Sequence, residues 1–141
     1  MAKKLQLRII TPDAVKVDEP VDMVIMRTST GDMGILPGRE PVSAVLYIGT
    51  MRIIADNEER LIAVYGGIAQ IQNDEVLIIC NGAQWPEEIE RDAAHAEHSE
   101  AESRLRNAQD KAQIQRDQFA MRRALVQIEV SSYPILGAGK K

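Results

Sequence analysis

The residues with the clearest potential for chemistry are the three glycines of GDMGILPG, residues 31–38. Glycine-rich loops can cradle a phosphate, but a Walker loop ends in Gly-Lys-Ser/Thr and a dinucleotide-binding loop follows Gly-x-Gly-x-x-Gly. Here the third glycine is followed by Arg39, Glu40 and Pro41, and no helical pattern comes after them. We therefore interpret the glycines as tight turns around a short apolar strand at residues 33–36, and not as a phosphate site.

The two histidines are the next candidates. His95 and His98 lie three residues apart in a helical pattern, with Glu102 one turn further along, so they could share a face as metal ligands. The spacing differs from His-Glu-x-x-His and a third ligand has no obvious source, so we expect two exposed helix histidines. Nucleophilic catalysis would need a histidine beside a hydroxyl, and the candidate hydroxyls are all remote in sequence: Ser29, Thr30 and Ser43. The sequence thus predicts a non-catalytic interaction protein without a metal.

Composition limits the remaining functions. The 141 residues carry a formal net charge of −4, which argues against nucleic-acid binding because little would neutralise a row of phosphates. No apolar stretch approaches the roughly 20 residues that a membrane-spanning helix needs, so we expect any work at a membrane to depend on partners. Cys80 is the single cysteine, and its apolar setting EVLIIC predicts a buried small hydrophobe rather than a reactive thiol.

Residues 1–85 have the pattern of a β-structure. Short segments rich in β-branched residues alternate with turn residues, and Leu5, Leu7 and Ile9 alternate with polar residues as in a half-buried strand. Many short strands at this spacing predict a sandwich or a barrel, and we expect an antiparallel β-sandwich. Turns are predicted at five places: Thr11-Pro12-Asp13, Gly49, Asp56-Asn57, Gly66-Gly67 and Asn73-Asp74.

Residues 86–132 change to a helical composition rich in Ala, Glu, Arg and Gln. Two helices, at about 87–106 and about 110–130, are predicted to form an antiparallel hairpin, with residues 133–141 as a flexible tail. The first helix has a mainly alanine stripe, so its docking would bury little area. The second has a stripe of larger residues: Ile114, Met121, Leu125 and Ile128. The predicted fold class is therefore α+β in two parts, a sandwich followed by a helical hairpin.

The two predicted helices carry opposite charges. The first is mainly acidic, whereas the second contains Arg116, Arg122 and Arg123. Folded as an antiparallel pair, the helices would attract one another, and opened out, the basic helix would be available to an acidic partner. The residues leave a simpler interpretation open, which is a solvated charged hairpin without a second state.

Three stretches resemble the epsilon-subunit family of F-type ATP synthases, to which the chloroplast epsilon and mitochondrial delta subunits also belong. GDMGILPGREPV resembles the family signature Gly-x-x-Gly-Ile-x-Pro-Gly-His-x-Pro, and YGGIAQIQNDEVLIICNGA resembles the stretch that closes the family's sandwich. RDQFAMRRALVQIEV is similar to the second helix of its C-terminal hairpin. These stretches occur in the family's order and cover nearly the whole chain.

The resemblance implies a non-catalytic rotor subunit of the central stalk, peripheral on the cytoplasmic face of the bacterial cell membrane. Its sandwich would hold the gamma subunit and rest on the ring of membrane c subunits, so that ion-driven rotation is coupled to ATP synthesis. Its hairpin would inhibit ATP hydrolysis by extending to a catalytic beta subunit. Carried over by position, the residues implied in partner binding are Asp32, Arg39 and Glu40 on the sandwich and Arg116, Arg122 and Arg123 on the hairpin.

The chain departs from the family pattern at two places. The signature histidine is replaced by Arg39, which would alter the local contact with gamma. Some bacterial members bind ATP through Ile-Asp-x-x-Arg-Ala at the start of the first helix, where this chain has Glu90 for the aspartate and Ala93 for the arginine. Arg91 could replace the lost arginine only from another helical face. We therefore predict weak or absent ATP binding, and no other cofactor.

An alternative hypothesis, from a different class of function, stays open. The chain could be a free-standing β-sandwich binding module whose helical tail is a coiled-coil dimerisation arm. A tight complex with a gamma-like subunit would favour the rotor subunit, whereas self-association through the tail would favour the binding module.

Overall fold

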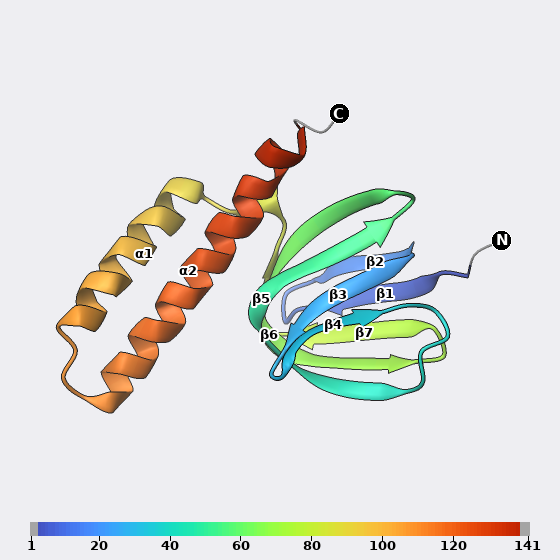
Figure 1. Cartoon of the computed structure of the whole chain (residues 1–141), viewed down its shortest axis with the longest axis horizontal. Coiled ribbons are helices and arrows are strands. Elements are labelled where there is room, and N and C mark those ends of the chain that lie inside the picture. The colour runs from blue at the N-terminus through green and yellow to red at the C-terminus, as the bar shows by residue number, and fades with distance from the viewer. Residues whose placement is uncertain (1–2, 139–141) are drawn as a thin grey trace. The chain divides into compact units, whose positions relative to one another are not determined.

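The computed structural model describes the backbone of residues 3–138 and the side chains as far as residue 132. The chain consists of two compact units, Met1–Gln84 and Trp85–Lys141. The first unit is a β-sandwich and the second is a helical hairpin, so the predicted fold class is confirmed (Figure 1). Within the described residues, the helices are too short or too polar to cross a membrane.

Eight strands form the sheet of the first unit, in the order β2-β1-β7-β6-β5-β3-β4, with β8 paired to β6. The pairs are antiparallel apart from β1 with β7, which are parallel. The bounds of the strands are β1 Leu5–Ile10, β2 Val15–Val21, β3 Met23–Thr28, β4 Gly31–Ile35, β5 Val42–Ala55, β6 Glu58–Gln72, β7 Glu75–Cys80 and β8 Ala83–Gln84.

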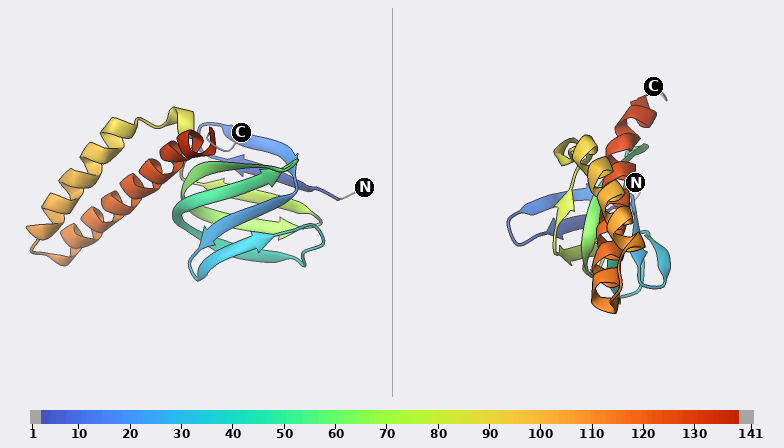
Figure 2. Two further views of the ribbon diagram at one scale, coloured as in Figure 1. Left: turned by 45° about the horizontal axis from the view of Figure 1, so that its top comes forward. Right: turned by 90° about the vertical axis from the view of Figure 1, so that its left-hand side faces the viewer.

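The sheet closes on itself through β5 and β6, which are long and curved (Figures 1 and 2). As a result β2, at one edge of the sheet, contacts β5 and the apolar faces enclose a core. Leu5, Leu7 and Ile9 of β1 are completely buried, which confirms the predicted alternation, and Ile53 of β5 and Ile78 of β7 are buried as deeply. Each such side chain stabilises the fold by roughly 1.5–3 kcal/mol relative to an exposed one.

Three of the five predicted turns are confirmed. Thr11 begins the β1–β2 connection, where its N–H donates to the Ala14 carbonyl at 2.9 Å. Asp56-Asn57 joins β5 to β6, and Asn73-Asp74 joins β6 to β7. All four residues have φ between 53° and 67°, which is the left-handed conformation that both central residues of a type I′ hairpin turn require.

The turns predicted at Gly49 and at Gly66-Gly67 are wrong, because these glycines lie inside β5 and β6. A β-carbon on Gly49 would lie 2.8 Å from Cβ of Arg27, so this glycine allows close strand packing instead of reversing the chain. Gly66 and Gly67 have φ of 89° and 155° and bend β6 where its partner changes from β7 to β8. A β-carbon on Gly67 would lie 2.3 Å from the Ile79 carbonyl oxygen. The segments that were predicted as separate short strands are therefore parts of two long strands, β5 and β6, which continue through these glycines.

The second unit begins with a short 3-10 turn, η1 Pro86–Glu88, and continues with α1 Arg91–Arg106 and α2 Lys111–Ala138. The Glu88 carboxylate accepts a hydrogen bond from the Trp85 N–H at 2.7 Å, which fixes the start of η1. The two helices lie side by side and antiparallel (Figures 1 and 2). α2 is longer than predicted, so residues 133–138 of the expected tail belong to this helix, and residues 139–141 lie outside the described part of the chain.

Small side chains are the most deeply buried ones along α1. Ala94 and Ala101, seven residues apart, are buried, which confirms the predicted stripe at these two positions, whereas Leu105 and Ala108 are half-buried and Ala112 is exposed. On α2 the buried row contains Asp117 and Ala124, also seven apart, whereas Leu125 of the predicted stripe is 51% exposed. The prediction for Leu125 is wrong because Leu125 lies at the edge of the buried side of α2, whereas Ile114, Met121 and Ile128 of the predicted stripe are half-buried.

Candidate interaction surfaces

The first predicted site residue, Asp32, is the second residue of β4, directly after the turn that joins β3 to β4. Gly31 has φ of 125°, and its carbonyl accepts a hydrogen bond from the Thr28 hydroxyl at 2.6 Å. Asp32 Oδ1 accepts a hydrogen bond at 2.6 Å from Nε of Arg27, its cross-strand partner. Both side chains are about half exposed, so the pair adds little stability. Its effect is to present a carboxylate to solvent in a defined direction.

The second predicted site, Arg39 and Glu40, follows a turn that a distant residue holds in place. Gly38 has φ of 88°, and its N–H donates to Oδ1 of Asp74 at 2.7 Å. Lys3 Nζ lies 3.1 Å from the other Asp74 oxygen. The Gly38 hydrogen bond, and after it the Lys3 ammonium, lower the pKa of the Asp74 carboxyl. Arg39 and Glu40 are exposed and are therefore available for contact.

The two turns lie at opposite ends of β4, and Arg39 reaches back to the middle of this strand. The Arg39 guanidinium Nη2 lies 3.9 Å from Sδ of Met33, the residue that follows Asp32 in β4. Because successive side chains of a strand point to opposite faces, the Arg39 contact with Met33 is on the face of β4 opposite to Asp32. Glu40 follows Arg39 directly in the chain. We call Asp32, Arg39 and Glu40, the charged residues around β4 that the sequence singles out, the turn surface.

A second surface on the sandwich was missed by the sequence interpretation. Val45, Ile68 and Ile79 are direct neighbours across β5, β6 and β7, and they are 58%, 45% and 47% exposed. Tyr47, two residues after Val45 on β5, is also about half exposed. We call these four residues the apolar face. The signal that could have revealed it is that they fall on the outward positions of strands whose alternate residues are buried, but only the strand register shows that they are adjacent.

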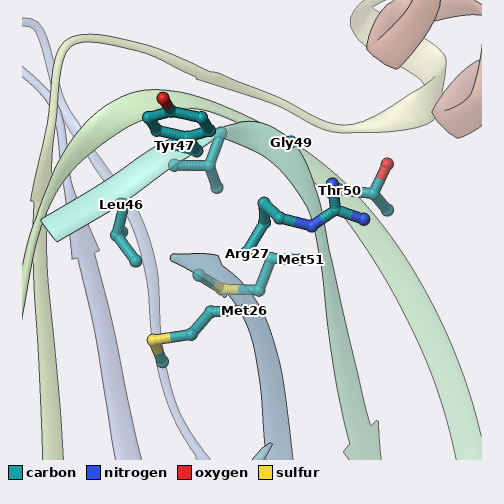
Figure 3. Close-up of a pocket in the computed structure, with 8 residues that line it drawn as sticks. Met26, Arg27, Leu46, Tyr47, Gly49, Thr50 and Met51 are labelled. Atoms are coloured by element: carbon teal, nitrogen blue, oxygen red, sulfur yellow. The ribbon is translucent and has the colours of Figure 1, made fainter. Parts of the chain in front are cut away.

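A shallow hollow lies on the sandwich (Figure 3). Arg27, the partner of Asp32, and Tyr47, of the apolar face, both line it, together with Met26, Leu46, Gly49, Thr50, Met51 and Val64. The hollow encloses about 160 Å³, including open solvent, whereas pockets for small molecules typically hold roughly 300–1,000 Å³. It is therefore a surface depression rather than a ligand cavity.

The three predicted arginines of the hairpin lie on α2. Arg116, Arg122 and Arg123 are exposed, and so is Phe119 between them. Arg116, Phe119 and Arg123 are spaced by three and four residues and so share one side of the helix. We call Arg116, Phe119, Arg122 and Arg123 the basic face. The sequence interpretation identified the charges of this face but missed its aromatic residue.

The candidate reactive groups do not form a catalytic or metal centre in the described residues. His95 is exposed and His98 half-buried on α1, and no cluster of three metal-ligating side chains occurs within residues 3–132. Cys80 is buried, as predicted, and this burial raises the pKa of its thiol. Glu90 and Ala93, which depart from the nucleotide motif, are exposed at the start of α1. Weak or absent ATP binding stays a prediction.

The two units together define a class of protein, a β-sandwich with exposed charged and apolar surfaces followed by a helical hairpin. Residues 4–86 match the family described as ATP synthase, Delta/Epsilon chain, beta-sandwich domain. The chain is 36% identical over 129 residues to the ATP synthase epsilon chain of Bacillus velezensis, which covers 92% of this chain and 98% of that one. It is 38% identical over 131 residues to the epsilon chain of Gloeothece citriformis, covering 90% and 94%. The chain therefore belongs to the epsilon-chain family of ATP synthases, which confirms the resemblance and the interpretation as a non-catalytic subunit.

Solved structures have the same fold. The chain is similar to one in the Euglena gracilis mitochondrial ATP synthase, OSCP/F1/c-ring, with a TM-score of 0.80 at 23% identity over 92% of this chain and 81% of that one. It is also similar to a chain in the central stalk/c-ring of the Tetrahymena thermophila mitochondrial ATP synthase, with a TM-score of 0.61 at 14% identity over 93% and 99%. At these identities the similarity concerns the fold alone.

Proposed function

We propose that the chain is a central-stalk rotor subunit of an F-type ATP synthase. In this role it couples rotation of the membrane c ring to ATP synthesis, and it inhibits ATP hydrolysis through its helical hairpin. The observation that carries the proposal is the apolar face, Val45, Tyr47, Ile68 and Ile79, because apolar side chains adjacent across three strands indicate a surface that a partner covers. Membership of the epsilon-chain family supports another ATP synthase subunit as that partner.

The gamma subunit is the proposed partner of the apolar face. The apolar centre would supply most of the binding free energy, and the charged turn surface beside it would set the orientation. The similar chains of Euglena and Tetrahymena come from assemblies named for the c ring and, in Tetrahymena, for the central stalk. These names support the proposal that the chain lies in the central stalk, next to the c ring.

The c ring is the proposed partner of the turn surface. Asp32 is held by Arg27, and the turn before Arg39 and Glu40 is held by Asp74. A rigid loop loses little conformational entropy on binding and can transmit torque without bending. We propose that this contact places the chain at the periphery of the membrane complex, on the cytoplasmic face of a bacterial membrane.

The catalytic beta subunit is the proposed partner of the basic face. Arg116, Arg122 and Arg123 would approach an acidic segment of beta, and Phe119 would add an apolar contact at the centre. This contact would require the hairpin to leave its folded state and would restrain rotation in the direction of hydrolysis. Electrostatic attraction would make the restraint weaker as salt concentration rises.

Co-purification with gamma tests the proposal. Ile68→Glu places a charge in the centre of the apolar face and should weaken gamma binding by roughly 30-fold or more, the cost of a lost interface anchor of about 2 kcal/mol. Leu125→Glu is the matched control, because Leu125 is about as exposed as Ile68 but belongs to α2, in the helical unit. Unchanged gamma binding of Ile68→Glu would refute the proposed interface. A chain that binds no gamma and self-associates through its helices would support the binding-module alternative.

A further inference from the structure

A charged pair crosses the alanine seam between α1 and α2. Arg104, near the end of α1, donates through Nε to Oδ1 of Asp117 on α2 at 3.1 Å. The same guanidinium donates through Nη2 to Oε2 of Glu97 at 3.2 Å and lies 4.0 Å from Glu100. Arg104 therefore links the two helices, and the acidic residues of its own helix fix the orientation of its guanidinium.

The two members of the pair differ in burial. The Asp117 side chain is 8% exposed and the Arg104 side chain 43%. The second oxygen of Asp117, Oδ2, is buried and accepts no hydrogen bond from the described part of the chain. A buried carboxylate that loses its cation is strongly destabilised, whereas an exposed guanidinium that loses its anion returns to water at little cost. Asp117 therefore depends on Arg104 much more than Arg104 depends on Asp117.

The other contacts between α1 and α2 are weak enough for this pair to influence strongly how firmly the two helices are held together. The buried side chains Ala94 and Ala101 of α1 and Ala124 of α2 are small, so each contributes little apolar area to holding the helices together. The larger side chains nearby are only half-buried: Leu105, Ile114, Met121 and Ile128. Asp117 lies one heptad before Ala124, in a row where a further alanine would fit. The seam thus contains a buried charge at a place where packing alone favours a methyl group.

We propose that Arg104 and Asp117 form a latch that sets how readily α1 and α2 separate. With the ion pair intact, the buried charge is compensated and the helices stay together. Without Arg104, the carboxylate favours separation, because separation returns it to water. Asp117 therefore lowers the free energy needed to separate α1 from α2, and Arg104 raises it again by compensating the buried charge. The use of this latch in restraining hydrolysis rests on the proposed function, whereas the latch itself is a property of the isolated chain.

The latch predicts opposite effects for the removal of its two members. Arg104→Gln leaves the buried charge uncompensated and should loosen the hairpin. Asp117→Ala removes that charge and extends the alanine row, so the hairpin should be at least as tight as before. If the ion pair only stabilised the contact between the helices, both variants would instead loosen the hairpin to the same extent. The double variant should resemble Asp117→Ala, because without the carboxylate the arginine has nothing to compensate.

Amide hydrogen exchange of the full chain, followed by mass spectrometry on α1 peptides, tests the latch. Arg104→Gln should accelerate exchange in α1 by about tenfold, which corresponds to roughly 1.4 kcal/mol, and Asp117→Ala should slow it or leave it unchanged. Arg106→Gln is the matched control, because Arg106 is exposed two residues further along the same helix. Peptides of β5 and β6 provide an internal reference and should exchange as in the wild type in every variant.

Equal acceleration by Arg104→Gln and Asp117→Ala would overturn the latch, and so would unchanged exchange in Arg104→Gln. Should Arg104→Gln lose its helical circular dichroism altogether, the double variant decides: recovery of the helices supports the latch, and failure to recover overturns it. The proposed function fails by a different measurement, the binding of Ile68→Glu to gamma. That result would leave the exchange rates, and hence the latch, unaffected.

Discussion

Asp74 and Gly38 are joined by a hydrogen bond across 36 residues of sequence, in which the Gly38 N–H donates to Oδ1 of Asp74 at 2.7 Å. Asp74 is part of the turn between β6 and β7, and Gly38 immediately precedes Arg39 and Glu40 of the turn surface. A hairpin turn thus fixes the geometry of the connection between β4 and β5. The position of Arg39 depends on a carboxylate that the sequence indicates only as a turn residue.

Replacing Asp74 with alanine should loosen the loop that contains Arg39 without unfolding the sandwich. The variant removes the acceptor of the Gly38 N–H and the partner of Lys3, so the loop should open more often. Trypsin cleavage after Arg39, followed by mass spectrometry, should become about fivefold faster, the effect of one lost hydrogen bond on a local opening equilibrium. Asp13→Ala, an exposed turn aspartate elsewhere on the sandwich, is the control. Equal cleavage rates in the two variants would show that Asp74 does not hold the loop.

Asp22 should make the stability of the sandwich depend on pH. Its Oδ2 accepts a hydrogen bond from the Asp56 N–H at 2.8 Å, and Lys4 Nζ lies 3.0 Å from Oδ1. The Asp56 hydrogen bond, and after it Lys4, lower the pKa of the Asp22 carboxyl below its ordinary value. Because the folded pKa is lower than the unfolded one, Asp22 stabilises the fold above its unfolded pKa, and this contribution is lost as the pH falls through the folded pKa.

Urea unfolding between about pH 7 and pH 2 checks this dependence. Asp22→Asn should have a lower urea midpoint than the wild type at neutral pH, and the difference should shrink as the pH falls. Asp13→Asn serves as the control and should follow the wild type throughout. A constant difference between Asp22→Asn and the wild type at every pH would show that the carboxylate charge is not responsible.

Local patterns in the sequence were sufficient for most of the fold. The alternation of Leu5, Leu7 and Ile9 predicts the buried face of β1, and Asn73-Asp74 predicts a two-residue hairpin by its turn chemistry. Glycine is less decisive, because it occurs both where a chain turns and where two backbones approach closely. Gly49 and Gly67 belong to the second kind, and distinguishing them requires the neighbouring strand, which only the folded chain supplies.

Two glycines inside strands, Gly67 of β6 and Gly34 of β4, should respond differently to alanine. A β-carbon on Gly67 would lie 2.3 Å from the Ile79 carbonyl oxygen and 2.6 Å from Cα of Cys80, and backbone atoms in a paired sheet cannot move away. Gly67→Ala should therefore lower the free energy of unfolding by about 3 kcal/mol or more. At Gly34 the nearest atom is Cε of Met23 at 3.0 Å, the end of a flexible side chain, so Gly34→Ala should change stability by less than about 1 kcal/mol. Equal unfolding free energies in urea titrations would contradict this account.

The candidate surfaces could be predicted only in part. The turn surface and the arginines of α2 are contiguous or periodic in the sequence, so their residues can be identified there. The apolar face combines Val45, Ile68 and Ile79 from three strands, and their adjacency depends on the register. The prediction from the charges of the hairpin was also incomplete. It relied on the prevailing sign of each helix, whereas Arg104 and Asp117, which pair across the seam, each carry the less common sign of their own helix.

The last prediction concerns the basic face of α2 in the assembled ATP synthase. If this face restrains hydrolysis by meeting an acidic partner, changing Arg116, Arg122 and Arg123 together to glutamine should raise ATP hydrolysis by about threefold to tenfold, because close charge pairs at interfaces contribute roughly 1 kcal/mol or more. ATP synthesis should be nearly unchanged, since the sandwich and its surfaces are intact. Deleting residues 86–141 sets the upper limit of the effect, and Lys111→Gln, an exposed cation at the start of α2, is the matched control. Hydrolysis that rises on deletion but not with the triple substitution would exclude these arginines as the contact. Hydrolysis that stays constant in both would leave the hairpin as a passive brace.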